Sequence, residues 1–348
     1  MTKRIVILPG DGIGPEVTAA MRDVLDAAAA RFDLALDVAE MPFGGAASDT
    51  CGDPLPDSTL KACLNSDAVF LGAVGGPRWD EAAVRPEQGL LRLRQKMEVY
   101  ANLRPIRMLP GLEAASPIKA ERVRGTDLLI VRELTGGLYF GEREETPDAA
   151  SDMCRYSRSE IARVARIAFA AARQRRGRVT SVDKANVLAT SRLWRQVVEV
   201  VQREEFADIA LDHQLVDSMA MKLITEPGGF DVVLTENLFG DILSDEASVL
   251  AGSIGLSPSA SLGAGPPSLY EPIHGSAPQI AGQDIANPIG AILSMAMMLR
   301  HSVEEYAAAD AVEQAVHGAI QNGLRTFDLG GNAGCAEAGR TIAAALPL

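Results

Sequence analysis

Residues 5–16 have the sequence Ile5-Val-Ile-Leu-Pro-Gly-Asp-Gly-Ile-Gly-Pro-Glu16. The apolar residues predict a short buried strand, the glycine-rich segment predicts a tight loop, and Pro15 marks the first turn of a helix over Glu16–Ala30. The spacing is not that of a Rossmann dinucleotide-binding loop, GxGxxG, which would need a glycine at position 15. The glycine turn permits close approach of either a ligand or a neighbouring strand.

Strand and helix patterns alternate along most of the chain. Short apolar runs typical of buried strands occur at 68–71, 128–131, 179–182 and 232–235, and helical patterns at 160–175, 191–203, 286–300 and 309–322. Such alternation predicts an α/β fold. The chain of 348 residues exceeds what one hydrophobic core usually serves, so we expect two domains, or one large α/β unit with a lobe.

The composition is that of an ordinary globular protein, with 47% hydrophobic and 23% charged residues. The net charge of −13 disfavours nucleic acid as a partner, because that binding depends on clustered lysine and arginine. No apolar run approaches the roughly 18 residues of a membrane span, and the run after the N-terminus is too short for a secretion signal. The four cysteines lack the spacing of a zinc or redox motif, so we expect free thiols and a cytoplasmic location.

The segment Thr235-Glu-Asn-Leu-Phe-Gly-Asp-Ile-Leu-Ser-Asp-Glu246 contains two aspartates four residues apart, Asp241 and Asp245. On a helix their side chains would point the same way, with Cβ atoms roughly 5–6 Å apart. Like charges at that spacing destabilise a helix, so a bound dication is one explanation, and oxygen-only ligands favour Mg²⁺ or Mn²⁺. The other explanation is a solvated acidic turn at the start of the helix.

Arginines recur in this acidic chain, at positions 92, 94, 104, 107 and 132. Arg132 ends the apolar run 128–131, and sites in open α/β sheets lie at the carboxyl ends of strands. A guanidinium group there can bind a carboxylate through two hydrogen bonds, although most arginines are surface residues. Tyr139 lies just beyond a glycine turn, where a packing role and an acid role are both open.

Lys184 follows another predicted strand, 179–182. A lysine beside a metal and arginines loses its proton more readily, as a general base must, whereas an exposed lysine without that setting has no such role. His274 lies in a loop punctuated by proline and glycine, which could cradle a planar ligand or be an inert turn. The polar segment 141–156 is either a solvated loop or an arm that reaches a partner subunit.

Together these segments resemble the isocitrate and isopropylmalate dehydrogenase family. The resemblance extends from Gly10 to about Arg300 and rests on seven ordered motifs. They are Gly10-Asp-Gly-Ile-Gly-Pro-Glu16, Leu90-Leu-Arg-Leu-Arg94, Tyr100-Ala-Asn-Leu-Arg-Pro105, Arg132-Glu-Leu-Thr-Gly-Gly-Leu-Tyr139, Asp183-Lys-Ala-Asn186, Asn237-Leu-Phe-Gly-Asp-Ile-Leu-Ser-Asp245 and Tyr270-Glu-Pro-Ile-His-Gly-Ser-Ala-Pro278. The fourth motif discriminates within the family, because isocitrate and homoisocitrate enzymes typically have Asn-Thr-Glu-Gly where this chain has Leu134-Thr-Gly-Gly137.

The resemblance implies a fold of two α/β domains that is distinct from the Rossmann fold. One domain would contain residues 1–98 and 253–348 and bind the cofactor. The other, 99–252, would serve dimerisation and the binding of substrate and metal, with an arm near 141–156. The resemblance also implies a homodimer in which Lys184 and Asp217 of one subunit complete the site of the other.

The implied activity is the oxidative decarboxylation of a 3-substituted malate, with reduction of NAD and a requirement for Mg²⁺ or Mn²⁺. Our first hypothesis is the isopropyl-substituted acid of leucine biosynthesis. Within the family, another 3-substituted malate, tartrate or malate is an alternative substrate, because an apolar pocket separates neighbouring alkyl groups by only about 1–3 kcal/mol. From a different class, the chain could be a non-catalytic paralogue that serves as a subunit or binding module.

The resemblance also implies a role for each site residue. Lys184 would be the general base and Tyr139 the acid. The implied metal ligands are Asp217, Asp241 and Asp245. The implied substrate contacts are Leu90 with Leu91, Arg94, Arg104, Arg132, Asp217 and the partner's Val187.

The implied cofactor contacts contain one departure from the family pattern. They are Gly75, His274, Gly275, Ser276, Ala277, Gln279 and Asn287. Where NAD-linked members usually have an aspartate for the ribose hydroxyls, this chain has Gln279, which can bond a hydroxyl but lacks the charge that repels a 2′-phosphate. NAD is still the predicted cofactor, because no lysine or arginine lies nearby in the sequence to pair with that phosphate.

Overall fold

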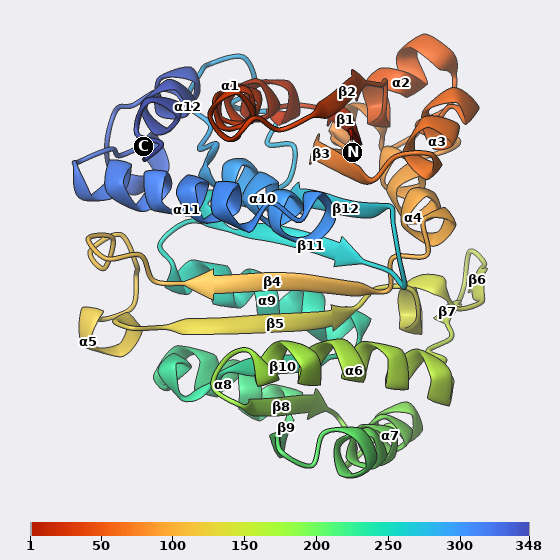
Figure 1. Ribbon diagram of the computed structural model, residues 1–348. Helices are drawn as coiled ribbons and strands as arrows, with labels where there is room; N and C mark the ends of the chain where they lie inside the picture. Colours follow the sequence, from red (N-terminus) through yellow and green to blue (C-terminus); the bar gives the residue numbers. More distant parts are fainter. Residues whose placement is uncertain (1, 348) are drawn as a thin grey trace. The chain divides into compact units, whose positions relative to one another are not determined.

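The computed structural model describes residues 2–347, which form two compact units (Figure 1). Unit 1 contains the residues up to 99, residues 109–115 and the residues from 251 onward, and unit 2 contains residues 100–108 and 116–250. The segment 109–115, which the sequence-based bounds place in the middle domain, clusters with unit 1. There Leu109 and Leu112 are buried and the Gly111 carbonyl accepts a 2.7 Å hydrogen bond from Arg325.

Unit 1 is built on strands in the order β2-β1-β3-β12-β11. Strand β1 pairs in parallel with β2 and β3, β3 pairs in parallel with β12, and β11 is antiparallel to β12. The strands are β1 (Lys3–Gly10), β2 (Leu36–Glu40), β3 (Ala68–Ala73), β11 (Pro258–Leu262) and β12 (Ser268–Pro272). The helices are α1 (Gly14–Phe32), α2 (Gly44–Cys51), α3 (Asp57–Leu64), α4 (Pro86–Lys96), α10 (Ile289–Met298), α11 (Tyr306–Gln321) and α12 (Cys335–Ala344).

The glycine loop after β1 packs against the chain's own backbone. Gly10 and Gly12 both have positive φ, +73° and +57°. A Cβ atom at Gly10 would lie 1.8 Å from the Ala73 carbonyl oxygen, and one at Gly12 would lie 1.9 Å from the Ser276 carbonyl oxygen. The two glycines therefore permit close approach of neighbouring backbone.

Unit 2 is built on strands in the order β4-β5-β10-β8-β9, of which β5, β10, β8 and β9 run parallel and β4 is antiparallel to β5. The strands are β4 (Ala101–Arg107), β5 (Asp127–Glu133), β8 (Arg178–Asp183), β9 (Ala210–Leu215) and β10 (Val232–Thr235). The helices are α5 (Ala120–Val123), α6 (Arg158–Arg173), α7 (Ala189–Glu205), α8 (Val216–Thr225) and α9 (Asn237–Leu250). Figure 1 shows α6 in front of the strands and α9 behind them, and both helices contact β5.

The parallel strands of unit 2 bring three predicted site segments to one edge. Because β5, β10 and β8 run in the same direction, their carboxyl ends lie at the same edge of the sheet. Arg132, Asn237 and Lys184 lie at or directly after these ends. The α/β fold and the strands predicted from the apolar runs are confirmed.

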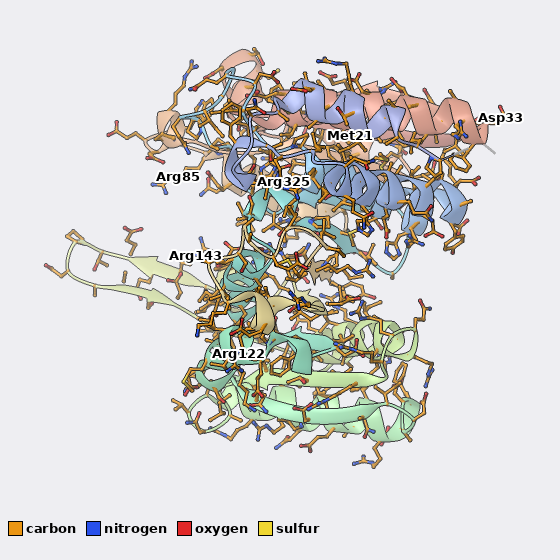
Figure 2. All side chains as sticks on the ribbon, turned by 90° about the vertical axis from the view of Figure 1, so that its left-hand side faces the viewer. Met21, Asp33, Arg85, Arg122, Arg143 and Arg325 are labelled. Atoms are coloured by element: carbon orange, nitrogen blue, oxygen red, sulfur yellow. The ribbon has the colours of Figure 1, made fainter. Side chains whose placement is uncertain are left out.

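The segment 141–156 contains an exposed antiparallel hairpin, formed by β6 (Arg143–Glu145) and β7 (Ala150–Asp152). Figure 2 shows this hairpin extending away from the rest of unit 2. A two-stranded ribbon without a packed face is only marginally stable in water. We therefore retain the prediction that it is an arm for a partner subunit. Within residues 2–347, no helix is long and apolar enough to cross a membrane.

Candidate functional site

The two aspartates of α9 form the centre of a charged cluster in unit 2. The Glu236 side chain accepts a 2.7 Å hydrogen bond from the Phe239 amide in the first turn, which stabilises the helix start. Asp241 accepts hydrogen bonds from the Arg132 guanidinium and, at 2.9 Å, from the Tyr139 hydroxyl. Asp245 lies 3.3 Å from Arg104. The prediction that the two carboxylates share one helix face is confirmed, and two arginines balance their charges.

Both arginines of this cluster are buried, and uncharged oxygens also hold them. The side chains of Arg104 and Arg132 are 8% and 3% exposed. Arg104 donates to the Asn102 amide oxygen at 2.7 Å and to the Ser244 hydroxyl at 2.5 Å. Arg132 donates to the Asn237 amide oxygen from Nε at 3.0 Å and from Nη2 at 2.8 Å.

The sequence-based reasoning did not select Asn102, Asn237 or Ser244. The spacing of two of them could have been used. Asn102 lies two residues before Arg104, on the same face of β4, and Asn237 lies four residues before Asp241, on the same face of α9. Gly240 allows the approach of α9 to β5, since a Cβ there would lie 2.6 Å from a carbon of the Arg132 side chain.

Burial changes the acidity of two groups in the cluster. Burial raises the pKa of Tyr139, and the neighbouring Asp241 carboxylate raises it further, so the phenol keeps its proton at neutral pH. Burial also raises the pKa of Asp245, against the opposing effect of Arg104. The chemistry available here is anion binding by two arginines, cation binding by two carboxylates and proton donation by one phenol.

Lys184 and Asp217 pair with each other in unit 2, with Nζ and Oδ1 2.5 Å apart. Asp217 lies in the first turn of α8, and the Lys184 ammonium holds the pKa of that carboxyl below its ordinary value. The Lys184 backbone N–H donates a 3.0 Å hydrogen bond to the Ser191 hydroxyl, which fixes the loop that carries Lys184. The buried Asp183 also fixes this loop, since it accepts two 2.9 Å hydrogen bonds from Arg195. Within the described part of the chain, no three acidic, histidine or cysteine side chains form a metal site, so Asp217 does not join Asp241 and Asp245 in one subunit.

Three predicted substrate contacts, Leu90, Leu91 and Arg94, lie in unit 1, on α4. The Leu90 side chain is buried, and the nearly buried Arg94 donates a 2.6 Å hydrogen bond to Glu271 of β12. Of the three predicted substrate arginines, unit 2 therefore brings together Arg104 and Arg132. Val187, the predicted contact from a partner, is 62% exposed in unit 2.

The predicted cofactor residues lie on loops at the carboxyl ends of β3 and β12 in unit 1. The buried Asp11 carboxylate accepts a 2.8 Å bond from the amide of Gly75, a residue with φ of +95°. His274 donates from Nδ1 to the Gly275 carbonyl at 3.0 Å. Its Nε2 is buried and has no hydrogen-bond partner among the described residues, and burial lowers the pKa of the imidazole, so Nε2 is a bare acceptor.

Three further cofactor predictions lie in the segment between β12 and α10. The buried Ser276 carbonyl accepts from the Ile13 amide at 2.8 Å, which ties the glycine loop to this segment. The Asn287 side chain donates to Asp328 at 3.0 Å. Gln279 is exposed.

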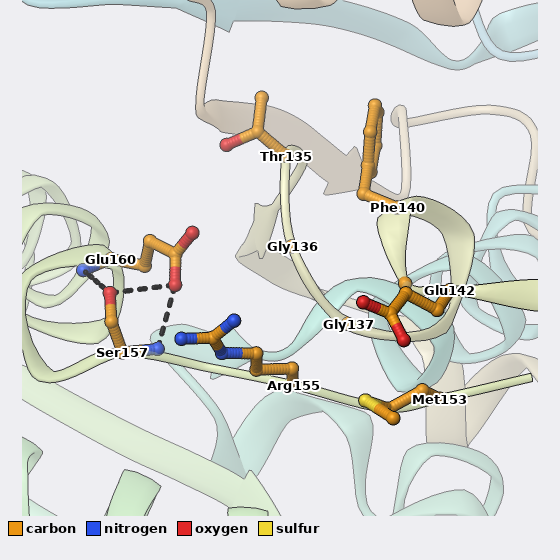
Figure 3. A pocket seen from close by; sticks show the side chains of 10 residues that line it. Thr135, Gly136, Gly137, Phe140, Glu142, Met153, Arg155, Ser157 and Glu160 are labelled. Carbon is orange, nitrogen blue, oxygen red and sulfur yellow. Dashed lines mark hydrogen bonds between the residues drawn. The ribbon is translucent and has the colours of Figure 1, made fainter.

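A separate pocket of about 360 Å³ lies beside the base of the hairpin (Figure 3). Ser157 and Glu160, which line it, bond each other at the start of α6, as the dashed lines show. The other lining residues are Thr135, Gly136, Gly137, Phe140, Gly141, Glu142, Met153 and Arg155. None of these lining residues is a predicted site residue. The candidate site is therefore identified from the charged side chains around Asp241 and Asp245, and not from this pocket.

An edge with two buried arginines, two helical carboxylates and a protonated phenol is suited to holding a small acid that carries carboxylates. The chain belongs to the isocitrate/isopropylmalate dehydrogenase family, whose model matches residues 4–342. It is 56% identical over 337 residues to a protein of Streptococcus thermophilus named 3-isopropylmalate dehydrogenase, and the match covers 97% of each chain.

Two solved structures share the fold. Isocitrate dehydrogenase from Methylococcus capsulatus has a TM-score of 0.89 and 35% identity, over 99% of both chains. A β-decarboxylating dehydrogenase from Thermococcus kodakarensis, in its apo form, has a TM-score of 0.83 and 39% identity, over 99% of this chain and 96% of that chain. The resemblance found from the motifs is therefore confirmed.

Proposed function

We propose that the protein oxidises and decarboxylates (2R,3S)-3-isopropylmalate to 4-methyl-2-oxopentanoate and CO₂, with reduction of NAD, in leucine biosynthesis. The observation that carries this proposal is the cluster of Arg104, Arg132, Tyr139, Asp241 and Asp245 at one sheet edge of unit 2. Its support from comparison is the 56% identity to a full-length relative named for this reaction. Other 3-substituted malates, tartrate and malate are less favoured substrates, and retention of the whole cluster argues against a non-catalytic paralogue.

The donors of the cluster fit a divalent metal. Asp241 and Asp245 offer only oxygen atoms, and Asp217 of the partner subunit would add a third carboxylate, a set that favours Mg²⁺ or Mn²⁺. A bound metal would make the substrate hydroxyl more acidic and stabilise the negative charge left by decarboxylation. The bare Nε2 of His274 and the loop amides around Gly75 fit a nucleotide, and bound NAD would accept the hydride from carbon 2.

The side chains of this chain perform the remaining steps. Arg104 and Arg132 hold the two carboxylates of the substrate in a fixed orientation. Lys184 of the partner subunit removes the proton of the hydroxyl as the hydride leaves, which gives a 2-keto acid with a β-carboxylate. Loss of CO₂ leaves an enolate, and Tyr139 gives its proton to the carbon from which CO₂ departed.

We also propose a homodimer formed through α8 and α9. Met221 and Ile224 are exposed on α8, and Asp217 lies on the same face, four residues before Met221. Ile242 and Val249 are exposed on α9, and Asp245 lies between them on that face. A second copy that covers these neighbouring apolar faces would bring Asp217 of one subunit towards Asp245 of the other.

A reducing compartment, the cytoplasm, is the proposed location. Cys51 is exposed, Cys63 and Cys335 are buried, and all three are free thiols, as is Cys154. Burial raises the pKa of both Cys63 and Cys335 to about 12, so neither has the thiolate character of a redox centre.

The direct test is NAD reduction with a panel of 3-alkylmalates, tartrate and malate, with and without Mg²⁺ or Mn²⁺. We expect the highest kcat/KM with 3-isopropylmalate and loss of turnover when a chelator removes the metal. No turnover on any acid of the panel would contradict the enzyme assignment. Turnover that survives the chelator would contradict the metal role alone.

Cofactor preference is a separate prediction that concerns Gln279. We expect kcat/KM to be higher with NAD than with NADP in the unsubstituted protein. The Gln279→Asp substitution should raise that ratio by about tenfold or more, because a carboxylate beside a 2′-phosphate adds like-charge repulsion. Gln314→Asp, at an exposed position of α11 in unit 1, is the matched control for added charge. A higher efficiency with NADP than with NAD would overturn the cofactor assignment.

A further inference from the structure

Arg104 and Arg132, at the sheet edge of unit 2, are both hydrogen-bonded to a buried asparagine. Each is almost fully buried, and each donates Nε to an asparagine side-chain oxygen: Arg104 to Asn102 and Arg132 to Asn237. Asn102 and Asn237 are 0% and 1% exposed. The carboxylates that also contact these arginines, Asp241 and Asp245, are the proposed metal ligands, so a bound dication would compensate their negative charge in place of the arginines.

The asparagine at position 237 is itself held in one orientation. Its amide oxygen faces two guanidinium donors, and its Nδ2 donates to the Gly136 carbonyl at 3.1 Å. Its backbone amide donates to the buried Tyr156 hydroxyl at 3.0 Å. A flipped side chain would place Nδ2 against the guanidinium donors and Oδ1 against the Gly136 carbonyl. The hydrogen bonds around Asn237 therefore define which atom is oxygen and which is nitrogen. Asn237 thereby links Arg132 to the loop that carries Tyr139.

We propose that Asn102 and Asn237 are positioning residues for substrate binding, which orient the two guanidinium groups through neutral acceptors so that their positive charges remain available to substrate carboxylates. This inference rests on the proposed function. An aspartate has almost the same shape and could accept the same hydrogen bonds from the arginine, although at position 237 it would lose the Nδ2 donor to the Gly136 carbonyl. Holding the guanidinium group does not by itself require a neutral acceptor. In a buried site, however, a carboxylate within hydrogen-bond distance of the guanidinium group would offset much of its positive charge. The arginine would then attract a substrate anion only weakly.

The test compares Asn237→Asp with Asn237→Ala. Both variants lose the Nδ2 donor to the Gly136 carbonyl. The aspartate keeps an oxygen for Arg132 and adds a negative charge, whereas alanine removes the oxygen and adds no charge. We expect KM for 3-isopropylmalate to rise about tenfold or more in the aspartate variant, above the KM of the alanine variant, with the KM for NAD unchanged. Titration calorimetry of 3-isopropylmalate with the Mg²⁺-loaded protein, without NAD, should show the same weakening of Kd. Asn65→Asp, at an exposed position after α3, controls for the change in net charge.

The outcomes separate this inference from the proposed function. If the unsubstituted protein does not turn over 3-isopropylmalate, the proposed function fails and the inference fails with it. If the unsubstituted protein turns over 3-isopropylmalate, two results overturn only the inference. One is an unchanged KM in the Asn237→Asp variant, and the other is a KM lower than that of the Asn237→Ala variant. Asn102→Asp places the same negative charge beside Arg104. It is the second test of the inference if the Asn237→Asp variant does not fold. An unchanged KM in a folded Asn102→Asp variant would overturn the inference, and a rise of about tenfold would support it.

Discussion

Replacing Lys184 with methionine is expected to lower kcat for 3-isopropylmalate by a factor of about 10³, because a positioned general base typically contributes 10²–10⁴-fold. Lys184 lies directly after β8 on a loop fixed by Ser191 and Asp183, so its ammonium group has a defined position. Methionine keeps most of the aliphatic chain and removes the group that exchanges the proton. The thermal unfolding midpoint should change little, since the Lys184 side chain is partly exposed and Asp217, with which it pairs, lies at the surface.

Two further variants separate proton transfer from charge. Lys184→Arg keeps the positive charge beside Asp217 but cannot lose its proton, so it should be nearly as inactive as Lys184→Met. Lys61→Met, at an exposed position of α3 in unit 1, should keep the kcat of the unsubstituted protein. If Lys184→Arg retained most of the activity, Lys184 would act through its charge and not as the base.

The parts of the fold that follow from local pattern were predictable. The apolar run 232–235 coincides with β10, and the run 128–131 lies within β5. A buried parallel strand has an apolar stretch bounded by polar residues, and this signal does not depend on distant partners. The spacing of Asp241 and Asp245 was informative for the same reason, because a helix fixes the direction of residues four apart.

Features that depend on contacts between distant segments were not predictable in the same way. The close approach at Gly12 depends on the Ser276 carbonyl, which is remote in sequence. Asn102 and Asn237 lie within quoted motifs, but an uncharged side chain gives no signal of chemistry until the guanidinium that it holds is located. The segment 109–115 clusters with unit 1 through Arg325, a contact that no periodicity encodes.

A mixture of two inactive variants should regain activity if the site is shared between subunits. Lys184→Ala and Asp245→Ala are each expected to be inactive as homodimers, because every site then lacks either the base or a metal ligand. In a heterodimer, one site combines Asp245 of the Lys184→Ala subunit with Lys184 of the Asp245→Ala subunit and is complete. The other site carries both defects. Heterodimers purified through two different affinity tags should therefore have about half the activity of the unsubstituted dimer.

The control for this experiment uses two residues that should act from the same subunit. Lys184 and Asp217 are paired within one chain, and both are proposed to enter the partner's site. A heterodimer of Lys184→Ala and Asp217→Ala therefore has one defect in each site and should stay inactive. If the first heterodimer is inactive while mass spectrometry shows both subunits present, the prediction of a shared site is wrong. Asp217 could then not act as a metal ligand together with Asp241 and Asp245. Activity in the control heterodimer would instead show that Lys184 and Asp217 act in different sites, which contradicts the arrangement deduced from the exposed faces of α8 and α9.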